Sequence, residues 1–332
     1  DVYKRQLGVP VAGEGEAQGR DTGPCEALAQ LHQVGAVVAR RVPVGDEDEL
    51  CGFEKIRDLA AAAPEDCEEG IGSGALGGEG CQSRVDFARY ALIEGMRERE
   101  RIGVNPFQFG MIGSTDNHNA APGAVEEDSY DGCCAKNDAT AEARLSITPA
   151  FAGAGMIGRN PGGLMGVWAE ENTRDALFDA MQRRETFATS GPRITPRFFG
   201  GWDLPHDLCA RPNLARTGYA RGVAMGGLLE TPARSGEGPT FVAHVTRDPG
   251  TASRPGGLLD RLQIIKVWHD EQGRFHQAVH EVAGRLDPAS VESREPPSVD
   301  LDSCAPQGEG QTELCAVWTD PEFDATRDAA YY

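Results

Sequence analysis

The change of hydrophobic period along the chain constrains its fold more than any other feature. Up to about residue 203, apolar residues recur in blocks that predict a helix over residues 84–102 and a short buried strand at residues 163–169. Farther along, apolar and polar residues alternate over residues 241–246 and again over residues 262–267. This alternation is typical of antiparallel hairpins. We therefore expect an α/β portion followed by a smaller β-rich portion.

The 332 residues exceed one typical domain, and we divide them into three segments. Residues 1–45 carry little periodic signal, residues 46–203 form the predicted α/β portion, and residues 204–332 form the β-rich region. The first six residues, DVYKRQ, look like a junction peptide at the end of a translated metagenomic fragment. We therefore expect the chain to be a piece of a longer protein.

The charge of the chain restricts its partners. There are 52 acidic and 32 basic residues, which give a net charge of −20. Proteins that bind the phosphate backbone need clustered positive charge, so the sequence predicts no nucleic-acid partner. It also contains no run of about 18 apolar residues, the length that a membrane-spanning helix requires. A soluble, solvated surface explains the acidity without a special function.

The nine cysteines do not form a metal or redox motif. No C-x-x-C pair occurs, which excludes zinc-ribbon and thioredoxin-like sites. Cys304 and Cys315 flank a polar loop that contains glycine, and a disulfide between them and two free thiols are equally compatible with the sequence. A disulfide would imply an oxidising compartment.

The strongest chemical signal is the segment GSTDNHNAAPG at residues 113–123. Asp116 and His118 lie two residues apart, directly after an apolar run that predicts a short strand at residues 106–112. A carboxylate and an imidazole at a strand end are suited to bind Zn²⁺, Mn²⁺ or Fe²⁺ together. The neighbours expected to orient these ligands are Ser114, Thr115 and Asn119. Alternatively, Asp116 only caps a loop through hydrogen bonds to backbone amides.

Two further places carry candidate residues. Glu170 and Glu171, in the sequence WAEEN, would serve as metal ligands or as a general base. The alternative is that they complement the positive end of the dipole of the next helix. Arg193, in the turn SGPR, is suited to bind a phosphate or a carboxylate with two hydrogen bonds, and a structural salt bridge is as compatible with the sequence.

Several long blocks resemble one bacterial family in order along the chain. The blocks at residues 105–128, 160–193 and 197–203 closely resemble the family known as domain of unknown function 3604. Three shorter blocks fit the same family, at residues 49–55, 262–268 and 314–324. The resemblance covers roughly residues 46–332 and is specific because the blocks are long and keep their order. Residues 26–45 match the corresponding family segment poorly.

That family in turn resembles a branch of the polymerase-and-histidinol-phosphatase (PHP) superfamily of metal-dependent hydrolases. The resemblance implies a distorted β/α barrel, of which this chain would be the C-terminal part. The last metal motif of the superfamily, D-x-H, corresponds to Asp116 and His118. It implies hydrolysis by a metal-bound hydroxide, with Glu170, Glu171 and Arg193 as candidates for proton transfer and anion binding.

The chain also departs from the superfamily pattern, because it contains no H-x-H motif. It would carry two ligands of a larger metal site, so we expect the chain alone to be inactive and its parent to be an enzyme. The expected substrate is a small molecule with a phosphoester, carboxyl ester or amide bond. The other hypothesis is a non-catalytic binding protein. Relatives that look exported, together with the Cys304–Cys315 pair, imply a periplasmic or exported protein, and the sequence predicts no oligomeric state.

Overall fold

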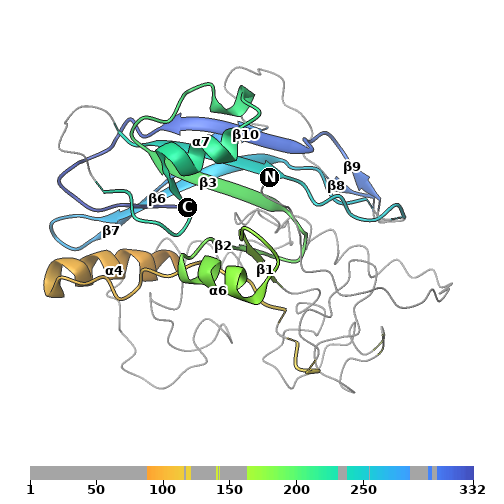
Figure 1. Ribbon diagram of the computed structural model, residues 1–332, viewed down its shortest axis with the longest axis horizontal. Coiled ribbons are helices and arrows are strands. Elements are labelled where there is room, and N and C mark those ends of the chain that lie inside the picture. Colours follow the sequence, from red (N-terminus) through yellow and green to blue (C-terminus); the bar gives the residue numbers. More distant parts are fainter. Residues whose placement is uncertain are drawn as a thin grey trace, which may run out of the picture. The chain divides into compact units, whose positions relative to one another are not determined.

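The computed structural model describes residues 88–115, 117–120, 140, 142, 163–230, 238–253, 255–284, 298–300 and 305–332 (Figure 1). These residues fall into two compact units. Unit 1 contains residues 109–263 and 281–323, and unit 2 contains residues 88–108, 264–280 and 324–332. Among the described residues, no helix is long and apolar enough to cross a membrane.

The main sheet of unit 1 has four strands in the order β10-β5-β3-β4. These strands are β3 (Thr195–Gly201), β4 (Val223–Ala224), β5 (Thr240–Thr246) and β10 (Glu313–Thr319). All three pairings are antiparallel, and β5 pairs along its whole length with both β3 and β10. The alternation at residues 241–246 is thus confirmed as a central strand with two paired edges.

One face of this sheet carries a compact core. Phe199 of β3 and Val317 of β10 both pair with Val242 of β5, so the three side chains lie on the same face. They pack against Leu204 and Leu208. Leu208 belongs to the short helix η5 (Leu208–Ala210), which precedes helix α7 (Leu214–Arg221). Figure 1 shows α7 along this sheet.

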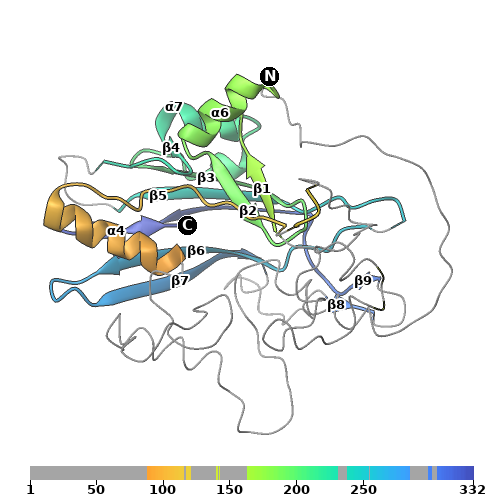
Figure 2. The ribbon, with the colours of Figure 1, turned by 90° about the horizontal axis from the view of Figure 1, so that it is seen from below.

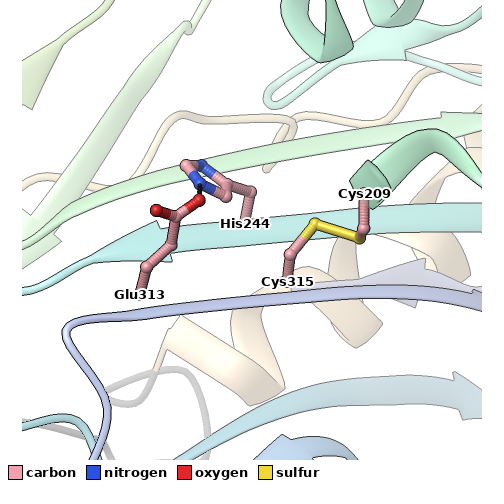
Figure 3. Close-up of a disulfide and its surroundings, with 4 residues drawn as sticks. All are labelled: Cys209, His244, Glu313 and Cys315. Atoms are coloured by element: carbon pink, nitrogen blue, oxygen red, sulfur yellow. Dashed lines mark hydrogen bonds and ion pairs between the residues drawn. A yellow bond between two sulfur atoms is a disulfide. The ribbon is translucent and has the colours of Figure 1, made fainter. Parts of the chain in front are cut away.

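A disulfide ties η5 to the sheet. Cys209 of η5 bonds Cys315 of β10, across a sequence separation of 106 residues (Figure 3). The sequence left open a disulfide between Cys304 and Cys315, and this pair does not form, because Cys315 is bonded to Cys209. Closeness along the chain suggested that pair, whereas Cys315 lies within a paired strand and faces the segment that covers the sheet.

A smaller part of unit 1 is built from β1 (Leu164–Val167), α6 (Arg174–Gln182) and β2 (Thr186–Thr189). The two strands pair antiparallel, from Leu164 opposite Thr189 to Val167 opposite Thr186. The N-cap of α6 is Thr173, whose hydroxyl accepts the backbone N–H of Ala176. Two very short strands, β8 (Ser298–Val299) and β9 (Pro306–Gln307), also pair antiparallel.

The predicted α/β fold, the C-terminal part of a PHP-like β/α barrel, is wrong. In the described part of the chain, the pairings with a defined register are all antiparallel, and none of the four sheets closes into a barrel. The order β1–α6–β2 resembles a parallel crossover in the sequence, but here the second strand returns beside the first in the opposite direction. The fold is therefore β-rich, with a few helices on its sheets.

Unit 2 has its own core. Helix α4 (Ala88–Ile102) packs with β6 (Arg261–His269), β7 (Phe275–Gly284) and β11 (Ala330–Tyr331), which form a sheet in the order β11-β6-β7. Figure 2 shows α4 beside these strands. Buried residues from the helix and the sheet make one cluster: Tyr90, Ile93, Met96, Ile265, Val267 and Phe275. The predicted helix end is confirmed, since Gly103 follows Ile102 with a φ of 82°.

The turn between β6 and β7 supports a prediction about acid stability. The Asp270 carboxylate accepts hydrogen bonds from His276 Nε2 at 2.9 Å and Arg274 Nε at 2.7 Å, and from the backbone N–H groups of Gln272 and Arg274. These bonds, above all the one from His276, hold the pKa of Asp270 well below its usual value. A depressed pKa contributes stability above the unfolded-state pKa of about 4, and the contribution is lost as the pH falls toward the folded-state pKa.

We therefore expect Asp270→Asn to lower the melting temperature above about pH 4, by an amount that shrinks as the pH falls below that value. Thermal melts of both proteins across this range would measure the effect. The control is Asp203→Asn, which removes an exposed carboxylate from unit 1. Equal, pH-independent differences for both variants would contradict the prediction.

Candidate functional site

The turn that carries Asp116 and His118 is called the corner below. The segment that leads into it is irregular and is fixed by backbone contacts. Residues 108–115 contain no strand, so the strand predicted at residues 106–112 is wrong. The backbone N–H of Gly163 donates to the carbonyl of Ser114 at 2.7 Å. A Cβ on Gly113 would lie only 2.7 Å from the carbonyl oxygens of Leu164 and Thr189, so this close approach requires glycine. The corner is thus fixed where β1 begins and β2 ends.

Within the corner, short side chains bind the backbone locally. The Thr115 hydroxyl accepts the N–H of Asn117 at 3.2 Å, and the Asn117 side-chain oxygen accepts the N–H of Asn119 at 2.7 Å. His118 is exposed between them. Asp116 lies outside the described residues. These turns determine the path of the chain on both sides of His118.

Strands β1 and β2, with α6 between them in the chain, form an antiparallel pair that is called the hairpin below. Glu170 and Glu171 lie past the end of this pair that is opposite to the corner. The backbone N–H of Trp168 donates to the carbonyl of Glu185 at 2.9 Å and continues the pairing beyond Val167. From Leu164 to Trp168 the chain rises about 13 Å at the usual strand spacing. Both carboxylates are exposed, and Glu171 accepts the hydroxyl of the N-cap Thr173 at 3.0 Å. The hairpin therefore separates them from the corner.

Arg193 follows β2 and so lies past the hairpin end at which the corner is fixed. Its backbone N–H donates to the carboxylate of Asp248, which is only 3% exposed. The other oxygen of Asp248 accepts the N–H of Gly250 at 2.8 Å. The SGPR turn is thus anchored through its backbone, and the Arg193 side chain is only partly buried.

The comparison with family models identifies the chain. Residues 20–332 match the family described as protein of unknown function (DUF3604). The chain belongs to this family. Comparisons with curated proteins and with solved structures gave no match. The DUF3604 match extends farther toward the N-terminus than the resembling sequence blocks, which begin at residue 49.

The donor chemistry of the corner suits a metal ion, because a carboxylate and an imidazole are common ligands of divalent transition metals. In this DUF3604 chain, His118 is exposed on a turn held by local hydrogen bonds. Groups of three or more metal-binding side chains do not occur within the described ranges, which exclude Asp116. Asp116 and His118 are thus the residues that would hold the ion.

Sequence reasoning missed a second cluster in this DUF3604 protein. Tyr219 of α7 donates its hydroxyl to Glu185 at 2.9 Å, and Arg183 donates to the other oxygen of that carboxylate, also at 2.9 Å. Burial and the bond to Glu185 raise the pKa of Tyr219. Arg197 of β3 lies over the indole of Trp168, 3.5 Å from the ring centre. The residues come from α7, from β3, from the turn between α6 and β2, and from the position after β1, so they form no motif in the sequence.

Proposed function

We propose that this DUF3604 protein is part of a metal-dependent hydrolase, in which Asp116 and His118 hold a divalent metal ion. The observation that carries the proposal is the exposed His118 ring on a turn that the Ser114–Gly163 hydrogen bond joins to β1. A bound Zn²⁺, Mn²⁺ or Fe²⁺ would lower the pKa of a water molecule and so supply a hydroxide nucleophile. The substrate would be a small phosphoester, carboxyl ester or amide.

The neighbouring residues have distinct parts in this proposal. Thr115 determines the turn on which His118 stands, through its bond to the N–H of Asn117. Ser114 joins the turn to β1, and Asn119 closes it. Arg193 follows the strand that ends at the corner, so it is the candidate for binding an anionic group of the substrate.

Glu170 and Glu171 would not contact the metal ion. They lie beyond the far end of the hairpin, about 13 Å or more along it by the usual strand rise. Glu171 also accepts the Thr173 hydroxyl at the start of α6, where a negative charge is favourable. Replacing each by glutamine would therefore change the metal content little.

The first test is the metal content of the purified protein. The double variant Asp116→Ala/His118→Ala is expected to lose most of the bound Zn, Mn or Fe, because it removes both ligands. Elemental analysis would measure this loss. The matched control is Asp203→Ala/His206→Ala, which removes an exposed carboxylate and an exposed imidazole that lie three residues apart. The control is expected to retain the metal.

Two outcomes would contradict the proposal. Negligible metal in the wild type and in both variants would remove the metal site. Bound metal in the parent-length protein without turnover of p-nitrophenyl phosphate, p-nitrophenyl acetate or an anilide would instead indicate a metal-binding protein without catalysis. Turnover of one of these three compounds would identify the bond type.

A further inference from the structure

Among the described residues, Arg197 has an aromatic and a hydroxyl neighbour but no carboxylate as an ion-pair partner. It stands on β3, is partly buried, and has its guanidinium carbon 3.5 Å from the centre of the Trp168 indole. The indole is itself held in place, because its N–H donates to the carbonyl of Pro196 at 2.8 Å. A guanidinium has five N–H donors in one plane. The indole covers one face of the guanidinium plane, so the N–H donors still point outward within that plane.

Other partly buried arginines of unit 1 use their donors within the protein. Arg184 donates to the carbonyl of Gly226 at 2.8 Å, and Arg247 donates to the carbonyl of Gly256 at 3.0 Å. Arg261 lies 3.2 Å from the carboxylate of Glu281. Within the described part of the chain, the Arg197 side chain hydrogen-bonds the neutral hydroxyl of Tyr219, and it has no ion pair with a carboxylate and no hydrogen bond to a carbonyl. Burying a charge partly without such a partner is costly unless a ligand supplies one.

The surroundings of Arg197 limit what that ligand is. Tyr219 lies near it, 43% exposed, and its hydroxyl donates to Glu185. His244 pairs directly with Arg197 across the sheet, so both side chains lie on one face. Its ring is turned toward Glu313, with 2.6 Å between His244 Nε2 and Glu313 Oε1 (Figure 3). The guanidinium thus lies over the Trp168 indole and beside Tyr219, and the nearby carboxylates are bonded to Tyr219 and His244.

We propose that Arg197, supported by Trp168 and beside Tyr219, binds the carboxylate of a small organic ligand. A carboxylate has two coplanar oxygens that match two parallel N–H groups of a guanidinium. The exposed Tyr219 ring and the edge of the Trp168 indole suit an apolar or aromatic body on the same ligand.

The charge balance favours a carboxylate over a phosphate. Glu185 and Glu313 already place negative charge near the site, and the whole chain carries a net charge of −20. A dianionic phosphate would meet about twice the repulsion that a singly charged carboxylate meets at the same distance. One guanidinium compensates one charge, so a monocarboxylate is the better match.

This ligand site is independent of the proposed metal corner. Trp168 lies at the end of the hairpin that is remote from Ser114, about 13 Å along the strand from Leu164. No step of the metal proposal uses Arg197 or Trp168. Loss of one site would therefore leave the other testable.

Benzoate is the probe for the test, with inorganic phosphate as the competing anion. The readout is the indole N–H signal of Trp168 in a nitrogen-15 spectrum, identified by its disappearance in Trp168→Phe among the four tryptophans of the chain. We expect a saturable shift with benzoate at millimolar or lower concentration. Arg197→Gln is expected to abolish saturation, and Arg197→Lys to weaken binding about tenfold because a lysine cannot make the paired hydrogen bonds.

The matched control is Arg216→Gln, which removes the same charge from an exposed position on α7. It should bind benzoate like the wild type. If wild-type protein shows no saturable shift, or if Arg197→Gln binds as well as the wild type, the site does not exist. If phosphate binds as tightly as benzoate, the assignment to carboxylates is wrong. If Arg197→Gln does not fold, the wild-type titration and the weaker binding expected for Arg197→Lys still test the site.

Discussion

Phe199→Ala is expected to lower the free energy of unfolding by about 3–5 kcal/mol. Phe199 is 2% exposed and lies at the centre of the unit 1 core, against Val242, Leu204 and Leu208. Its ring also meets the edge of Tyr219, with 5.0 Å between ring centres. The packing is close enough that a Cβ on Gly218 would come within 2.7 Å of the ring, so removal of the ring leaves a cavity that the rigid sheet cannot fill.

Chemical denaturation of the purified variant would measure this loss. The matched control is Phe178→Ala, because Phe178 on α6 is 55% exposed and loses the same atoms. The control is expected to change the unfolding free energy by less than about 1 kcal/mol. Comparable losses for the two variants would mean that Phe199 does not occupy the core that the structure describes.

Removal of the Cys209–Cys315 disulfide is the second change with a large expected effect. A cross-link that closes a loop of 106 residues restricts the unfolded chain, which corresponds to about 4–5 kcal/mol in the chain-entropy account. Because η5 also buries Leu208 completely, the disulfide acts on a segment that already packs on the sheet. We therefore expect Cys209→Ala/Cys315→Ala to keep the fold and to lower the midpoint of denaturation.

Two measurements would check this prediction. Denaturation curves of the oxidised wild type and the double variant give the difference in stability. Peptide mapping without reduction should recover one cross-linked pair that contains Cys209 and Cys315. A cross-link between Cys315 and any other cysteine would contradict the pairing, and identical denaturation curves would contradict the stabilising effect.

The local elements of this protein follow from its sequence to a large extent. The apolar repeat before Gly103 predicts α4, and the run GLMGVWA predicts β1. Alternation over residues 241–246 and 262–267, with the turn at Asp270–Gly273, predicts β5, β6 and the hairpin to β7. These elements depend on which side chains face a core, and that information is contained in the spacing of neighbouring residues.

Which of these elements pair with one another could not be predicted from the sequence. Strand β10 pairs with β5, about seventy residues earlier, and Cys315 pairs with Cys209 rather than with the nearer Cys304. Period-two alternation determines which face of a strand is buried but does not specify its neighbour or its direction. The resemblance to a barrel superfamily implied parallel neighbouring strands. This expectation was wrong, because β1 and β2 are antiparallel.

The candidate site was predictable only where its residues are adjacent in the chain. Asp116 and His118 form a recognisable pair because they are two residues apart. Arg197 lies on β3 and Trp168 directly follows β1, so the indole and the guanidinium meet only after folding. Glu170 and Glu171 were candidates for proton transfer at this pair, yet they lie past the far end of the paired strands β1 and β2.

The connection between η5 and β10 also determines when this protein can mature during synthesis. Cys209 leaves the ribosome 106 residues before Cys315, an interval of roughly 5–20 s at ordinary elongation rates. During that interval β5 has only one of its two final neighbours, since β10 has not been made. A chain interrupted before residue 313 would thus keep an unpaired strand edge and an unmatched thiol at the same time, and the unpaired edge would be open to pairing with another chain.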